Sequence, residues 1–72
     1  MVCFNERLKS IRKSKKLTQK KVAKDTKIAE RAYQSYEGNE GKPSFEALIA
    51  LADYFDVSLD YLVGRSDNPG RI

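Results

Sequence analysis

The chain of 72 residues contains no histidine, no tryptophan and a single cysteine, Cys3. One cysteine forms no internal disulfide, and without histidine the mixed cysteine–histidine zinc sites are excluded. We therefore expect no metal, no cofactor and a reducing, cytoplasmic setting. The sequence also lacks a nucleophile elbow, a glycine loop for phosphate and a cluster of carboxylates, so we expect no enzyme and no small-molecule substrate.

Long apolar runs are absent as well, and "MVCF" at the start is too short for a signal peptide. These two features predict a soluble protein with no membrane partner. β-Branched residues are few and never alternate with polar ones over a useful length, so we expect no strands.

Charge is distributed unevenly along the chain. Residues 1–27 carry ten lysines and arginines against two acids, a net charge of +8, whereas residues 28–72 carry four against eight, a net charge of −4. This asymmetry favours one face for a polyanion. A lysine-rich surface that is merely solvated is the alternative.

Capping residues and apolar spacing predict an all-α domain of five short helices. The expected helices span 6–15, 19–25, 29–37, 45–56 and 59–63. Asn5, Thr18, Ser44 and Ser58 are the expected N-caps of the first, second, fourth and fifth helices, and Gly64 is the expected stop. Leu48, Leu51, Ala52 and Phe55 form the strongest apolar stripe.

Two of these helices, 19–25 and 29–37, are joined by a tight turn and suggest a helix-turn-helix. On a helical wheel, Ala29, Ala32, Tyr33 and Tyr36 share one side of the second helix. Glu30, Arg31, Gln34 and Ser35 share the other, and their side chains have the chemistry to bind base edges in a major groove. An ordinary solvated face is the alternative, although lysine–glutamate pairs would be more usual there.

Three segments carry a resemblance to a known family: "LTQ" at 17–19, the "YE…G…P" loop, and "LADYFDVSLDYLVGR". Together they make residues 4–65 resemble the Cro/C1-type (Xre-like) helix-turn-helix regulators of phages and bacteria. The resemblance implies a five-helix, lambda-repressor-like domain over 1–65, with the helix-turn-helix at 18–37. It also implies binding of double-stranded operator DNA, usually as a homodimer.

The resemblance assigns further roles to individual residues. It makes 29–37 the recognition helix, with Glu30, Arg31, Gln34 and Ser35 at base edges. It places Gln19 at the DNA backbone. Backbone contacts are also expected from Lys42 and from Lys20 and Lys21, which stand where the family often has acids. For Gln19 a purely helical role is the alternative, and simple solvation is the alternative for one of Lys20 and Lys21. Arg12 and Glu37 are expected to pair with each other and hold the first helix against the third.

The chain departs from the family at the turn between the two helices. Thr26 and Lys27 stand where an apolar residue and a glycine are usual, and glycine suits a left-handed backbone better than lysine does. Ala29 replaces the usual serine or threonine cap of the recognition helix. Thr26 is an alternative cap that would begin the helix earlier.

Two functions remain open from the sequence. The first is a sequence-specific transcriptional regulator, with repression expected, that binds a (pseudo)palindromic operator. The second is an antitoxin-like or adaptor module of the same fold. Candidates for the dimer surface, or for simple packing, are Tyr54, Val57, Tyr61, Val63 and Ile72. Residues 66–72 are expected to be a tail or the start of a linker.

Overall fold

The computed structural model describes residues 3–70 and contains five α-helices. Their bounds are α1 Phe4–Ser14, α2 Gln19–Thr26, α3 Glu30–Glu37, α4 Phe45–Phe55 and α5 Leu59–Leu62. Helices are the only regular elements within residues 3–70, as the sequence predicted. None of them is long and apolar enough to cross a bilayer.

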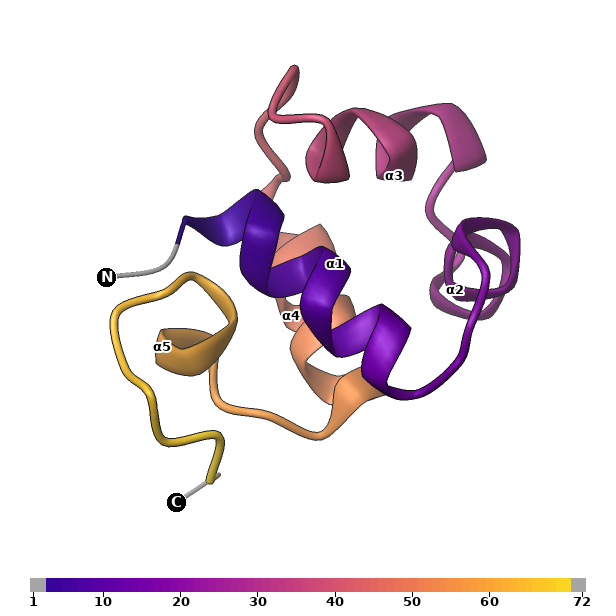
Figure 1. The fold of residues 1–72 in the computed structure, drawn as a ribbon. Helices are drawn as coiled ribbons and strands as arrows, with labels where there is room; N and C mark the ends of the chain where they lie inside the picture. The colour runs from indigo at the N-terminus through magenta and orange to yellow at the C-terminus, as the bar shows by residue number, and fades with distance from the viewer. Residues whose placement is uncertain (1–2, 71–72) are drawn as a thin grey trace.

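Figure 1 shows α1 across the front of the molecule, α3 above it, α2 to the right and α5 to the lower left, with α4 behind. The core lies between these helices because each contributes side chains that are almost fully excluded from solvent. The largest of them are Tyr33, Phe55, Leu8, Leu51, Leu62 and Val22. The apolar stripes expected from the sequence are therefore the ones that form the core.

Serine and threonine caps fix where three helices begin. The Thr18 hydroxyl accepts from the Lys21 amide, Ser44 accepts from Ala47, and Ser58 accepts from Tyr61. The cap predicted for the first helix is wrong. This helix begins at Phe4, so Asn5 lies inside it. Cys3 occupies the N-cap position, and its side chain makes no capping hydrogen bond. The apolar Phe4 packs against the core, and the helix therefore begins two residues earlier than expected.

The turn between α2 and α3 has a left-handed residue, Lys27, with φ of 60°. The Ile28 amide donates to the Ala23 carbonyl at 3.0 Å, which closes the end of α2 in the manner usual for a glycine. Thr26 does not cap α3, whose N-cap position is Ala29. Thr26 is the last residue of α2, and its hydroxyl donates to the Val22 carbonyl at 2.7 Å. A lysine, which is unfavourable in this conformation, thus occupies the left-handed end of α2.

This geometry gives a stability prediction. Replacing Lys27 by glycine removes the steric cost of a left-handed lysine, about 1–2 kcal/mol. Glycine also gives the unfolded chain more conformational freedom, which lowers the stability of the fold by about 0.4–1 kcal/mol. We expect Lys27→Gly to raise the free energy of unfolding by about 0.5–1 kcal/mol, measured by urea denaturation. Lys24→Gly is the matched control, because Lys24 lies inside α2 and should lower stability by about 1 kcal/mol. Destabilisation by both variants would contradict the prediction.

The segment after α5 is held back onto the domain as far as it is described. Gly64, with φ of 87°, ends the helix region, and the Ser58 amide donates to the Pro69 carbonyl at 3.1 Å. Arg7 on α1 donates to the Asp67 carboxylate at 3.0 Å. Residues 66–70 therefore pack beside α1 and α5.

Candidate nucleic-acid interface

The outer face of α3 is polar and open. Glu30, Arg31 and Gln34 are exposed, while Tyr33 beneath them is completely buried. The Gln34 amide donates to the Glu30 carboxylate at 3.3 Å. This contact lies between exposed groups one helical turn apart, so it holds the two side chains side by side without removing either from solvent.

Ser35 is less available than the other three predicted base-reading residues. It is half-buried, and its hydroxyl donates to the Ala32 carbonyl at 2.7 Å. The loop after α3 also presses against it: a Cβ atom added to Gly41 would lie 2.9 Å from the Ser35 Oγ atom. Three side chains, and not four, thus face outward freely.

An ion pair fixes α3 against α1. Arg12 Nε donates to Glu37 Oε2 at 2.7 Å, and its Nη2 donates to Glu37 Oε1 at 3.1 Å. Arg12 Nη1 also donates to the Leu17 carbonyl at 2.8 Å. The Glu37 side chain is only 3% exposed and that of Arg12 12%. The pair expected from the sequence is therefore present, bidentate and shielded from water.

Gln19 joins this pair from α2. Its Nε2 atom donates to Glu37 Oε1 at 3.1 Å. The amide has a second hydrogen that this bond leaves unused, so Gln19 can donate in two directions. The three helices α1, α2 and α3 therefore meet at one carboxylate.

The surroundings of Glu37 set its ionisation. Burial alone would raise the pKa of its carboxyl, but the hydrogen bonds that the carboxylate accepts, that from Arg12 above all, act together with the Arg12 charge and hold the pKa below the ordinary value. A carboxyl whose pKa is lower in the folded than in the unfolded chain stabilises the fold above the unfolded value. This contribution disappears as the pH falls through the folded pKa.

We therefore expect acid destabilisation that depends on Glu37. Below about pH 4.5 the Glu37 carboxyl is protonated in the unfolded chain but stays ionised in the folded chain. The free energy of unfolding therefore falls with a slope of at most about 1.4 kcal/mol per pH unit. Urea unfolding at pH 7, 5, 4 and 3 should show a shallower fall for Glu37→Gln than for the unaltered chain. Glu6→Gln, the same substitution at an exposed position, is the comparison, and a slope unchanged by Glu37→Gln would refute the assignment.

The lysines predicted to bind the DNA backbone are all exposed, but they differ in their contacts. Lys20 and Lys42 have no ion pair within residues 3–70. Lys21 Nζ lies 3.2 Å from Asp25 Oδ2, one turn along α2. Asp25 also accepts from the Tyr54 hydroxyl at 2.7 Å, and this bond is the main reason why the pKa of Asp25 is lowered. Lys21 thus also takes part in the contact between α2 and α4.

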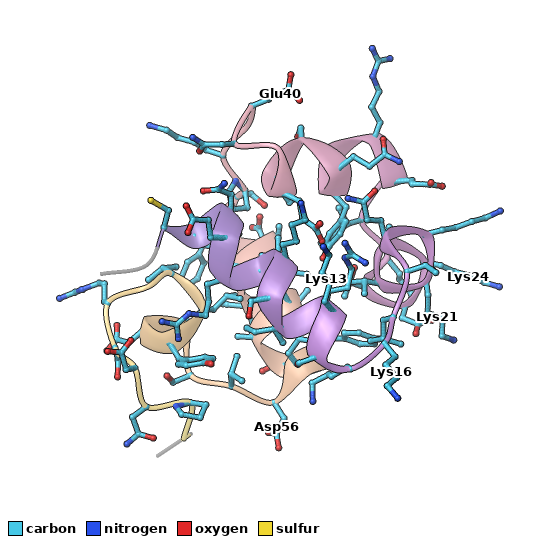
Figure 2. All side chains as sticks on the ribbon, in the orientation of Figure 1. Lys13, Lys16, Lys21, Lys24, Glu40 and Asp56 are labelled. Carbon is cyan, nitrogen blue, oxygen red and sulfur yellow. The ribbon has the colours of Figure 1, made fainter. Side chains whose placement is uncertain are left out.

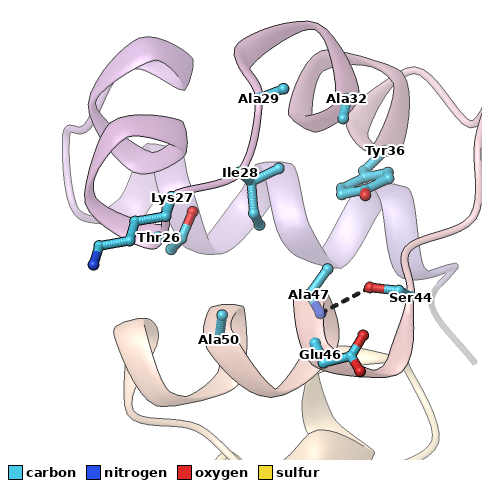
Figure 3. A pocket seen from close by; sticks show the side chains of 10 residues that line it. All are labelled: Thr26, Lys27, Ile28, Ala29, Ala32, Tyr36, Ser44, Glu46, Ala47 and Ala50. Carbon is cyan, nitrogen blue, oxygen red and sulfur yellow. Dashed lines mark hydrogen bonds between the residues drawn. The ribbon is translucent and has the colours of Figure 1, made fainter.

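An open groove of about 400 Å³ lies behind the start of α3 (Figure 3). The turn residues Thr26–Ala29, with Ala32 and Tyr36, form one wall, and the first half of α4 forms the other. Small and apolar side chains predominate, and Lys27 and Glu46 are its charged residues. Within residues 3–70 there is no group of three acidic or cysteine side chains that could hold a metal.

The burial and the contacts of Arg7 were not predicted from the sequence. Its side chain is 7% exposed, its guanidinium lies 3.9 Å from the centre of the Tyr61 ring, and it donates to the Ser66 carbonyl and to Asp67. Its wheel position beside Leu8 and Ile11 was the available signal. An arginine stacked on a ring and paired with a carboxylate is a favourable way to bury this charge.

Comparisons with known proteins agree with this geometry. A family model described as "Helix-turn-helix" matches residues 8–62. The chain belongs to the Cro/C1-type helix-turn-helix family. Among curated relatives, an uncharacterized HTH-type transcriptional regulator, YobD of Bacillus subtilis, is 41% identical over 92% of this chain and 59% of its own length. The cryptic phage CTXphi transcriptional repressor RstR of Vibrio cholerae is 40% identical over 86% of this chain and 55% of its own.

A solved structure gives the same result at the level of the fold. The crystal structure of a transcriptional regulator from Listeria innocua matches with a TM-score of 0.79 and 38% identity, over 85% of this chain and 57% of that one. The five-helix, lambda-repressor-like fold is therefore shown. The chain spans somewhat more than half the length of these relatives.

Proposed function

We propose that this chain is a sequence-specific DNA-binding transcriptional regulator that acts as a repressor and inserts α3 into the major groove of its operator. The observation that carries the proposal is the open face of Glu30, Arg31 and Gln34 on a helix anchored by Tyr33 and by the pair of Arg12 and Glu37. A helix anchored in this way can present its side chains to base edges in one register. Arginine pairs well with guanine, glutamine with adenine, and glutamate accepts from cytosine.

Contacts to the DNA backbone complete the proposed site. Gln19 follows the Thr18 cap at the start of α2, where free amide groups and the positive end of the helix dipole favour a phosphate. Its unused amide hydrogen supports a phosphate contact beside its bond to Glu37. Lys20, Lys21 and Lys42 supply further positive charge, and Ser35 is a secondary member of the reading face. In this proposal residues 1–65 are the DNA-binding domain and 18–37 its helix-turn-helix.

A homodimer is part of the proposal, because two recognition helices about 34–36 Å apart fit successive turns of a (pseudo)palindromic site. Of the residues predicted for its surface, Val57 is buried in the core, whereas Tyr54, Tyr61 and Val63 are half-buried. Ile72 lies outside the described residues. Leu59, with 38% of its surface exposed at the start of α5, is the apolar side chain that supports a contact on this side.

An adaptor or antitoxin-like module of the same fold is the second function, and one experiment separates the two. Duplexes that bind the protein are selected from a random pool, and affinity for the selected site is measured against salt. A regulator should enrich a two-fold symmetric motif and lose affinity steeply as salt rises, because phosphate contacts release counterions. An adaptor would enrich no motif and bind all duplexes weakly. That result would refute the proposal.

A further inference from the structure

A group of lysines gathers where α1 ends and α2 lies beside it, away from α5 (Figure 2). We call Lys13, Lys16 and Lys24 the corner lysines. All three are exposed, and none has an ion pair within residues 3–70. Lys21 lies in the same region but is paired with Asp25. The proposed reading face and backbone contacts use none of the three.

This concentration of charge is unfavourable for the isolated domain. Like charges crowd the corner with few acids to offset them, since residues 1–27 carry ten cations and only two acids. Lys16 also has a left-handed backbone, with φ of 57°, at a place where glycine would be easier. Asp25 lies in this region, but it is paired with Lys21 and also accepts from the Tyr54 hydroxyl. Because other acids lie elsewhere, as Glu40 and Asp56 do in Figure 2, the corner has the electrostatics of a surface for a polyanion.

The position of the corner identifies the polyanion. In Figure 1, α2 lies on the opposite side of the molecule from α5. In a dimer joined near α5, each α1–α2 corner therefore points away from the two-fold axis and toward the outer ends of the DNA site. The domain measures at most 28 Å in its longest dimension, which corresponds to about eight base pairs at 3.4 Å each.

We propose that the corner lysines bind phosphates of the duplex that flanks each half-site, beyond the base pairs that α3 reads. This inference rests on the proposed function and adds a partner surface to it. The contacts carry no sequence information, because they are made to phosphates alone. They lengthen the stretch of duplex that the protein contacts, and they increase the dependence of the binding affinity on salt.

The test compares two duplexes with the same operator. The core duplex ends at the outermost base pair defined by selection, and the extended duplex adds about ten base pairs, one helical turn, at each end. Three extra phosphate contacts per subunit should steepen the salt dependence of binding to the extended duplex. Compared with the core duplex, the extended duplex should lose about 40-fold more affinity for each subunit when the salt concentration rises fourfold.

Single variants locate the effect. Lys13→Gln, Lys16→Gln and Lys24→Gln should each reduce the extra salt dependence by about one third and leave affinity for the core duplex unchanged. Arg65→Gln is the matched control, because it removes the same charge from an exposed position after α5 and should change neither duplex.

Each other result has a distinct meaning. Equal binding of both duplexes by the unaltered protein, with the core bound specifically, would overturn this inference and leave the proposed function intact. Equal weakening of both duplexes by the lysine variants would also overturn it, because the contacts would then lie inside the half-site. Failure to bind any duplex specifically would refute the proposed function itself, and this inference with it.

Discussion

Replacing Arg12 by alanine should lower the free energy of unfolding by about 3 kcal/mol. The variant leaves the Glu37 carboxylate, 3% exposed, with the Gln19 amide but without its opposite charge. An unpaired buried charge is costly, and the Leu17 carbonyl also loses its donor. For a chain of this size the melting temperature should fall by on the order of 15 °C, measured by circular dichroism.

Lys9→Ala is the control for this prediction. Lys9 lies on the exposed side of the same helix, so its removal should change stability by less than about 0.5 kcal/mol. A double variant, Arg12→Met with Glu37→Leu, replaces both charges by apolar groups of similar size and should recover more than half of the loss. Equal melting temperatures for Arg12→Ala and Lys9→Ala would show that the pair contributes nothing.

Replacing Arg31 by alanine should weaken binding to the selected operator by about 1–3 kcal/mol and relax the preference at one base pair. Arg31 is exposed on α3, and no ion pair holds it within residues 3–70. Its removal should therefore leave the melting temperature almost unchanged. Affinity is measured by fluorescence anisotropy on the operator and on a single-base variant of it.

Lys20→Ala is the comparison for Arg31→Ala. A lysine that binds a phosphate should weaken all sequences alike and reduce the slope of affinity against salt by about one unit. If Arg31→Ala instead weakened random and selected DNA equally, Arg31 would be a backbone contact and not a base-reading residue.

Most of the fold could be predicted from the sequence because the signals were local. Thr18, Ser44 and Ser58 cap the helices they were expected to cap, since a hydroxyl that bonds an amide three residues later needs no help from the rest of the chain. The prediction of Asn5 as a cap was wrong because the start of α1 depends on a contact that is not local. Packing of Phe4 against the core, a tertiary contact, moved the start of α1 past it.

The candidate site divides in the same way. The outward direction of Glu30, Arg31 and Gln34 follows from the period of the helix, so the sequence was enough. The partial burial of Ser35 follows from the loop at Gly41, which approaches from outside α3. The hydrogen bonds of Gln19 to Glu37 and of Arg7 to Asp67 join residues that are 18 and 60 positions apart, and no local sequence pattern predicts such contacts.

The start of α3 has a consequence for dynamics. Ala29 supplies no side-chain cap, and the open groove behind the turn gives this end of the helix little support. The amides of Glu30, Arg31 and Ala32 precede the first hydrogen bond of the helix, which Tyr33 donates to the Ala29 carbonyl. These amides should exchange with solvent deuterium far faster than the amide of Tyr33. DNA that covers them should slow their exchange, so the same three positions report on docking without any mutation.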